Sequence, residues 1–207
     1  SAMALCTEKF LQSRNQIEIF QETYPLIGKV TNADHLYYYE NDPKTNLINQ
    51  KYKWAKENVT LQITPLQSFT HENLFEITNK AKKRKIFNAY VRKLDDTFLK
   101  KLLTVNEIKS ILILPIFIKD EFTGFIGLDD CSVERDWSED EINILQTLAS
   151  NIASSLERIA NEAEIKQSEE KFRLLANNIP GTVYLSKYDE KWSKIYLNDE
   201  IENLTGY

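Results

Sequence analysis

The longest regular pattern of apolar and polar positions lies between Trp137 and Asn178, a stretch without glycine or proline. Apolar side chains recur there at a three-four spacing, at Ile142, Leu145, Ala149, Ile152, Leu156, Ile159 and Ala163. This spacing places them on one face of an α-helix, as in a helix that packs along a second helix. Ser138 and Glu141 have the spacing of a capping box, which predicts the helix start. The pattern predicts a helix of about forty residues, roughly 60 Å long.

A second three-four series begins the chain. Its apolar members are Cys6, Phe10, Ile17, Phe20, Tyr24 and Ile27, with Ser13 as a polar interruption. We interpret it as one amphipathic helix that ends near Gly28, since a glycine is common at a helix C-terminus. The two matching series predict a parallel homodimer. Its interface is expected to use Phe10, Ile17, Phe20, Tyr24, Ile142, Leu145, Ala149, Ile152, Leu156 and Ile159.

Between the two helical series, strand and helix patterns alternate. The predicted order is strands at 33–40 and 47–56, a helix at 69–84, a strand at 86–91, a helix at 95–104, and strands at 110–118 and 124–128. Pro115 inside the nearly continuous apolar run 110–118 predicts a bulge, or a place where the strand's hydrogen bonding changes side. The order predicts an α+β fold in which helices flank an antiparallel sheet.

After Pro180 the strand and helix patterns restart, with strands at 181–185 and 194–197 and a helix at 198–204. Two strands and one helix do not close a sheet domain of ordinary size. We therefore expect residues 178–207 to be the truncated start of a second domain. Residues 159–177 are expected to be a helical linker of coiled-coil character. Ser1-Ala2 ahead of Met3 indicates that residues 1–4 include a cloning remnant.

Composition narrows the classes of function. The chain has 207 residues, 42% of them hydrophobic, and a formal net charge of -5, which argues against a nucleic-acid partner. No apolar run approaches membrane-spanning length, so we expect a cytoplasmic segment without membrane contact. Cys6 and Cys131 have no CxxC partner and no metal-like spacing to His35 or His71, so no metal site is expected.

Three segments carry a family resemblance: residues 108–117 (IKSILILPIF), 124–130 (GFIGLDD) and 135–138 (RDWS), with Tyr52-Lys53-Trp54 upstream. Together they resemble a GAF domain, most closely the GAF domains of bacterial sensor kinases, over roughly residues 5–158. Residues 168–175 (SEEKFRLL), 196–198 (YLN) and 204–207 (LTGY) resemble the opening of a PAS domain.

The resemblance implies a regulatory role. GAF and PAS domains sense small molecules or act as dimerising relays that pass changes along helices to an output domain. We therefore expect a non-catalytic sensory and dimerisation fragment of a bacterial signalling protein whose output is a histidine kinase of a two-component system. Cofactors are not expected, because the cyclic-nucleotide signature of such domains is missing and neither cysteine nor histidine has the setting of a bilin or haem ligand.

Two alternatives stay open. The first is a true sensor with a non-covalent small molecule between the sheet and the helix at 95–104. The expected pocket residues are Trp54, Phe87, Tyr90, Phe98, Leu102, Ser110 and Leu112, which could equally fill the core. The second is a small-molecule enzyme domain that uses the same pocket. A polar, convergent pocket with a shifted carboxylate would favour the enzyme, and a dry aromatic core would favour the relay.

Overall fold

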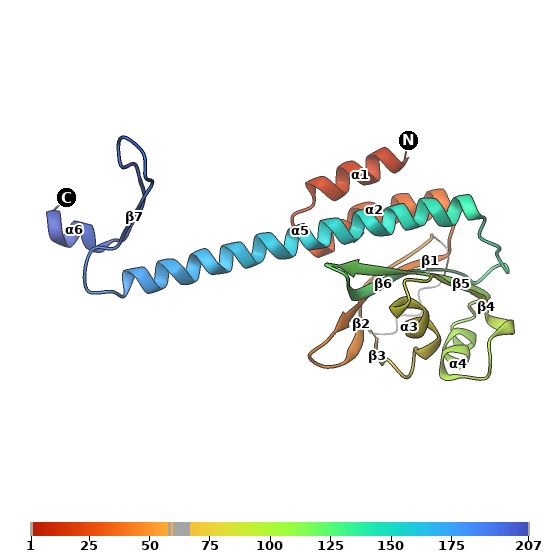
Figure 1. The fold of residues 1–207 in the computed structure, drawn as a ribbon. Helices are drawn as coiled ribbons and strands as arrows, with labels where there is room; N and C mark the ends of the chain where they lie inside the picture. The colour runs from red at the N-terminus through yellow and green to blue at the C-terminus, as the bar shows by residue number, and fades with distance from the viewer. Residues whose placement is uncertain (1, 58, 60–66, 207) are drawn as a thin grey trace. The chain divides into compact units, whose positions relative to one another are not determined.

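A computed structural model describes residues 2–57, 59 and 67–206. The chain divides into two compact units, Ser1–Ile159 and Ala160–Tyr207. The first unit is an α+β domain built on a six-stranded antiparallel sheet, and the expected fold class is confirmed. Its strand order is β3-β2-β1-β6-β5-β4 (Figure 1). The strands are β1 (His35–Asp42), β2 (Leu47–Ala55), β3 (Ser68–Thr70), β4 (Phe87–Tyr90), β5 (Ser110–Ile118) and β6 (Glu121–Asp130).

Helices cover both faces of this sheet (Figure 1). One face packs against α2 (Gln16–Thr31) and the first part of α5 (Glu139–Asn177), and α1 (Ala2–Gln12) packs on these two helices. The other packs against α3 (Phe75–Lys82) and α4 (Phe98–Val105), with a short 3-10 turn at Val91–Lys93. Because successive side chains of a strand point to opposite faces, each central strand contributes to both cores. On β1, Tyr38 packs toward α2 and Tyr37 toward the α3 and α4 side.

The single N-terminal helix expected from the sequence is wrong, because two helices form. The chain breaks at Ser13-Arg14, and the Asn15 side chain caps α2 by accepting a hydrogen bond from the Glu18 backbone nitrogen at 3.0 Å. The second helix ends at Thr31, followed by Asn32 in the left-handed conformation, and not at Gly28. Gly28 lies inside the helix, where a Cβ would come within 2.2 Å of the Trp54 ring. Glycine therefore permits close helix–sheet packing there.

Three details of the sheet also differ from expectation. The start of the helix predicted at 69–84 is instead the edge strand β3, and α3 begins only at Phe75. The hairpin between β5 and β6 turns tightly at Lys119 and Asp120, which both have positive φ. Pro115 pairs regularly with Phe125, and the register shift lies at Ile116/Phe117. Because β4 begins at Phe87, opposite Ile113, the rest of β5 has no partner on that side in the described sheet and is an edge, where proline is tolerated.

The long helix forms as one continuous element, with the predicted capping box at its start. The Ser138 backbone nitrogen donates to Glu141 at 2.9 Å, and the Glu141 backbone nitrogen donates to the Ser138 hydroxyl at 3.3 Å. None of the helices in the described part of the chain, α5 included, is both long and apolar enough to cross a membrane.

The interface first assigned to a dimer is buried inside the chain itself. Of that set, Phe10, Phe20, Tyr24, Leu145, Ala149, Ile152 and Leu156 belong to the core between the helices and the sheet, Ile142 and Ile159 pack against that core, and Ile17 is exposed. Both apolar series are covered within the chain, since α2, α5 and the sheet pack on one another. A homodimer thus remains a prediction without the interface proposed for it.

The second unit holds the end of α5, a two-stranded pair β7 (Tyr184–Ser186) and β8 (Lys194–Leu197), and α6 (Glu200–Thr205). Asn198, 1% exposed, ties it together. Its side chain donates to the backbone oxygens of Ala176 and Gly181 and accepts from the Val183 nitrogen, at 2.9 to 3.0 Å. These elements agree with the predicted strands and helix. The PAS resemblance itself stays a prediction, and its last residue, Tyr207, lies outside the described residues.

We predict that Leu145→Ala lowers the free energy of unfolding by about 2–5 kcal/mol, because Leu145 is fully buried by its own chain. Ile144→Ala is the matched control: it removes an aliphatic side chain of the same composition from the next position, which is 46% exposed, and should cost about 0.5 kcal/mol. Urea unfolding measures both. A Leu145→Ala loss that shrinks to the control value at low protein concentration would show that a partner chain buries this residue.

Candidate functional site

A cavity of about 90 Å³ lies on the α3 and α4 face of the sheet. Its walls are mostly apolar: Phe69, Leu74, Ile77, Leu99, Leu102, Leu103, Ile108, Ile111, Ile113 and Phe125. Tyr37 and Tyr39 of β1 add two further rings, 5.6 Å apart edge to face, and Tyr39 stacks on Phe125. The strand residues in this wall are the alternate positions that face α3 and α4.

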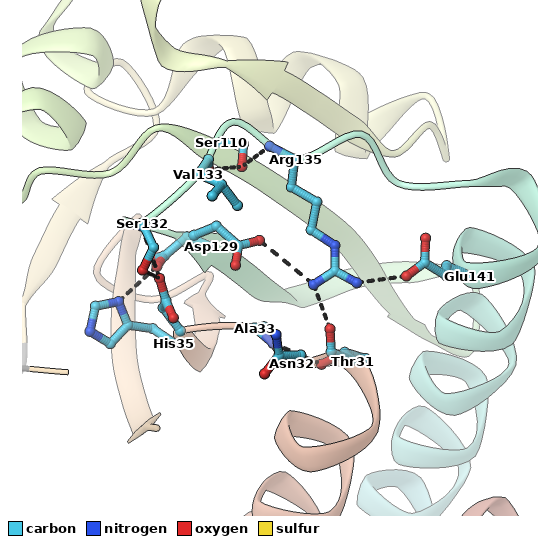
Figure 2. Close-up of polar contacts among 12 residues, drawn as sticks. Thr31, Asn32, Ala33, His35, Ser110, Asp129, Ser132, Val133, Arg135 and Glu141 are labelled. Carbon is cyan, nitrogen blue, oxygen red and sulfur yellow. Dashed lines mark hydrogen bonds and ion pairs between the residues drawn. The ribbon is translucent and has the colours of Figure 1, made fainter. Parts of the chain in front are cut away.

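One end of the cavity is polar, and its centre is a buried histidine–aspartate pair. His35 Nδ1 lies 2.7 Å from Asp129 Oδ1, and the two side chains are 8% and 2% exposed. They meet because His35 and Asp129 are direct partners in the register of β1 and β6 (Figure 2). Burial raises the pKa of Asp129, and the hydrogen bond from His35 opposes that rise. The other ring nitrogen, His35 Nε2, is buried and has no hydrogen-bond partner in the described structure.

Cys131, two residues after Asp129, completes this polar end. Its sulfur lies 3.9 Å from His35 Nδ1, 4.0 Å from Asp129 Oδ1 and 3.8 Å from the Asn106 backbone oxygen. Burial, with the nearby carboxylates of Asp129 and Asp34, raises the pKa of Cys131 to about 12. The thiol alone is therefore a poor nucleophile at neutral pH.

The same geometry argues against a catalytic triad. In a triad, the acid and the nucleophile contact opposite nitrogens of the histidine ring. Here Asp129 and Cys131 both approach Nδ1. Asp129 is a carboxylate with a shifted pKa, which would favour an enzyme. Among the described residues, however, no nucleophile contacts His35 Nε2.

Asp34 holds the segment that follows β6. Its Oδ2 accepts three hydrogen bonds, from the Cys131 nitrogen at 2.9 Å, the Ser132 nitrogen at 3.1 Å and the Ser132 hydroxyl at 2.9 Å. Burial opposes ionisation of Asp34, but these hydrogen bonds outweigh it and lower the pKa of the carboxyl. The start of β1 thereby fixes the path of the chain as it leaves the polar end of the cavity.

Arg135 then joins this segment to the helices, an arrangement that we call the Arg135 junction (Figure 2). Its guanidinium donates to the Thr31 backbone oxygen at the end of α2 and, at 2.6 Å, to Glu141 in the first turn of α5. It also lies 3.8 Å from Asp130 and stacks 3.8 Å from the centre of the Trp137 ring. One side chain thus contacts the end of β6, the end of α2 and the start of α5.

Of the seven residues predicted to line a pocket, only Leu102 does so. Trp54 and Leu112 pack on the opposite face, with α2 and α5. Ser110, fully buried, accepts a hydrogen bond from the Arg135 backbone nitrogen at 3.1 Å. The reason is strand parity: a pocket facing α4 takes the odd positions 111 and 113 of β5, and the sequence prediction took the even ones.

The other three predicted residues also do not line the cavity. Phe87 is buried in the core on the α3 and α4 side, and Phe98 is exposed at the start of α4, edge to face with Phe69. Tyr90 hydrogen-bonds Asp136.

The sequence analysis also missed the polar end of the cavity. The sequence showed no metal-like spacing between Cys131 and His35, and neither Asp129 nor Asp130 was predicted as a site residue. The structure places both aspartates in β6 as buried side chains. The cue available was the two-residue period of the strand predicted at 33–40, which puts His35 on the same face as Tyr37 and Tyr39. The distance of 96 residues between His35 and Cys131 hid their proximity.

We predict that Arg135→Lys lowers the free energy of unfolding by about 2–3 kcal/mol, because a lysine cannot contact Thr31 and Glu141 together. Arg92→Lys is the control, since Arg92 pairs with Glu134 on the surface and its side chain is 63% exposed; it should change the free energy by less than about 1 kcal/mol. Denaturant unfolding of both variants checks this. Equal losses would mean that Arg135 is an ordinary surface ion pair.

The chain is similar in sequence and in fold to known proteins. One relative is the methanogenesis regulatory histidine kinase FilI of Methanothrix harundinacea (strain 6Ac), 32% identical over 177 residues. The match covers 82% of this chain and 20% of the relative, so the chain spans about a fifth of that kinase's length.

Solved GAF domains share the fold. The phycoerythrobilin-bound GAF domain of a cyanobacterial phytochrome superposes with a TM-score of 0.68 at 18% identity, over 78% of this chain and 96% of that one. The GAF domain of an Acinetobacter phosphoenolpyruvate-protein phosphotransferase gives a TM-score of 0.60 at 12% identity, over 77% and 93%. Residues 15–156 match the family model described as "GAF domain". The chain therefore belongs to the GAF domain family.

Proposed function

We propose that this chain is the cytoplasmic sensory input of a histidine kinase, and that its GAF domain binds a small molecule and transmits the occupancy of the cavity to α5. The kinase output is supported by the 32% identity to a regulatory histidine kinase. The observation that carries the sensory role is the unpartnered, buried Nε2 of His35 beside an apolar cavity. A buried polar atom without a partner is costly, and a ligand that hydrogen-bonds it removes that cost.

The cavity indicates the size and chemistry of the ligand. At about 90 Å³ it is smaller than an engineered cavity of about 150 Å³ that holds benzene. This favours a ligand much smaller than the bilins named for the structurally similar photosensors. Cys131 adjoins the polar end of the cavity without being one of its lining residues, and Cys6, a residue of α1, is buried in the core on the other face of the sheet. We infer a compact, largely apolar molecule with one hydrogen-bonding group directed at His35.

The proposed route from the cavity to α5 begins at the His35–Asp129 pair. Asp129 lies two residues before Cys131, whose backbone is held by Asp34, and the segment continues directly to the Arg135 junction. A ligand that shifts Asp129 or Cys131 therefore displaces the residues that orient the first turn of α5. Because α5 is a continuous helix, a change at its start is a mechanical input to whatever follows it.

An enzymatic role is the weaker alternative. The His35–Asp129 pair could act as a general base through Nε2. The raised pKa of Asp129 is the shifted carboxylate that we expected of an enzyme. Sensing needs only that Nε2 accept a ligand, and most of the other lining residues are apolar, with Gln50, Lys53, Gln67 and Asn106 as the polar exceptions. We therefore favour the sensor.

Two five-membered rings test the ligand chemistry. When Nδ1–H donates to Asp129, neutral His35 leaves Nε2 as an acceptor. Pyrrole, which donates an N–H, should then bind about 2- to 10-fold more tightly than furan, which has the same shape and no donor. Calorimetry or ligand-observed NMR measures both affinities. In His35→Leu the preference for pyrrole should disappear.

Blocking the cavity tests its link to α5. Leu102→Trp should abolish pyrrole binding, and Val105→Trp, at an exposed position of the same helix, should leave it intact. In the wild type, saturating pyrrole should change amide hydrogen exchange in the first turns of α5, and in Leu102→Trp it should not. If pyrrole binds and exchange in α5 stays the same, the domain binds a ligand but the proposed relay is wrong.

A further inference from the structure

We propose that His35, Asp129 and Cys131 form a binding site for a divalent transition-metal ion of the zinc class at the polar end of the cavity. The site deepens the proposed sensory function, on which its regulatory meaning rests, because it names the chemical class of one ligand of the same cavity. Metal binding itself is independent of any relay.

The three ligand atoms already lie close to a metal-binding arrangement. His35 Nδ1, Asp129 Oδ1 and Cys131 Sγ are 2.7, 3.9 and 4.0 Å apart. Around a tetrahedral zinc ion with ordinary bond lengths, nitrogen, oxygen and sulfur ligands are separated by about 3.3 to 3.6 Å. Forming the site therefore requires the histidine–aspartate pair to open by roughly 0.6 Å and the sulfur to approach by roughly 0.4 Å. Side-chain rotations of this size leave the strands in place.

The backbone fixes where these ligands lie. His35 and Asp129 are register partners on adjacent strands, and Asp34 holds the Cys131 nitrogen at 2.9 Å. Hydrogen bonds of this kind orient metal ligands in proteins. The Asn106 backbone oxygen lies 3.8 Å from the sulfur. The fourth position is left to that oxygen, to water, or to a molecule in the cavity.

The surrounding charge favours a cation. Asp34, Asp129 and Asp130 are each less than 4% exposed and cluster around Cys131. Facing them in the described structure are Arg135, 3.8 Å from Asp130, with Lys53 on the cavity wall and Lys56 near Asp34. Arg135 is already shared with Glu141. Buried carboxylates interact strongly at low dielectric, so a divalent ion at the polar end stabilises them.

The mixed ligand set indicates which ions fit. One imidazole nitrogen, one thiolate and one carboxylate oxygen suit zinc and its first-row neighbours, and a single carboxylate is too few for calcium or magnesium. Cys131 is partly exposed, which gives an ion an entry path. The orphaned Nε2 of His35 faces away from the metal and stays available to a ligand in the cavity.

Cobalt(II) is the direct probe, because a thiolate ligand gives it a charge-transfer absorption band. The full chain, stripped with EDTA and kept reduced, should bind one equivalent of Co²⁺ with this band and with the visible bands of a tetrahedral site, and Zn²⁺ should displace it. Cys131→Ser should abolish the charge-transfer band, and His35→Gln and Asp129→Asn should each weaken binding at least tenfold.

Matched controls come from the chain itself. Cys6→Ser removes the other cysteine, and His71→Gln the other histidine, which contacts Asn41 instead; neither should change the cobalt spectrum. No saturable binding, a band that survives in Cys131→Ser, or a band lost in Cys6→Ser would overturn the proposal.

The pyrrole experiment separates the two proposals. A metal on Nδ1 leaves Nε2 with the ring proton, so the loaded protein should lose its preference for pyrrole over furan. If cobalt fails to bind while pyrrole still alters α5, the metal site is wrong and the sensory function stands. If cobalt binds at Cys131 while neither probe alters α5, the metal site stands and the relay is wrong.

Discussion

Burial of both faces of one antiparallel sheet is the constraint on which the rest of this structure depends. Every side chain of β1, β5 and β6 must face either α2 and α5 or α3 and α4, and the two-residue period of a strand decides which. The even positions Tyr38 and Leu112 belong to the core shared with α2 and α5, and the odd positions Tyr37 and Ile111 line the cavity. Neighbouring residues of one strand therefore contact the two different faces. A ligand that contacts one residue is only one position along the chain from a residue that contacts the helices on the other face.

The end of β6 uses this proximity. Asp129 faces the cavity, Asp130 is oriented toward Arg135, and the following residues are held by Asp34 before the chain enters α5. Four features lie within a few residues of one another: the ion pair of Asp130 with Arg135, the proposed metal ligand Cys131, the hydrogen bonds from the backbone to Asp34, and the capping box of α5. Polar groups buried this densely are favourable only when nearly all are satisfied. Under the proposed function, a change of partner at His35 or Cys131 alters the contacts that orient the start of α5.

Local patterns predicted most of the elements, because capping and periodicity are local. Ser138 and Glu141 cap α5, and the apolar run that starts at Ser110 forms a central strand. The features that were predicted wrongly depend on contacts between residues far apart in the sequence. The apolar series that includes Leu145 and Ile152 was assigned to an interface with a second chain, because the sequence does not show that the sheet covers this series. The pocket was placed on Leu112 rather than Ile113 because parity depends on which face receives the helices. The proximity of His35 to Cys131 was missed because it depends on the pairing of β1 with β6, which places His35 opposite Asp129 and which the sequence does not show.

The central claim is that occupancy of the cavity reaches the start of α5, and the three tryptophans of the chain measure it directly. Trp137 lies at the Arg135 junction, Trp54 packs against Gly28, and Trp192 belongs to the second unit. Fluorine NMR of protein labelled with 5-fluorotryptophan, assigned by single Trp→Phe variants, follows all three during a pyrrole titration. The account predicts that the Trp137 resonance shifts in proportion to occupancy while that of Trp192 stays fixed. A Trp137 resonance that does not move when the cavity is saturated would contradict it.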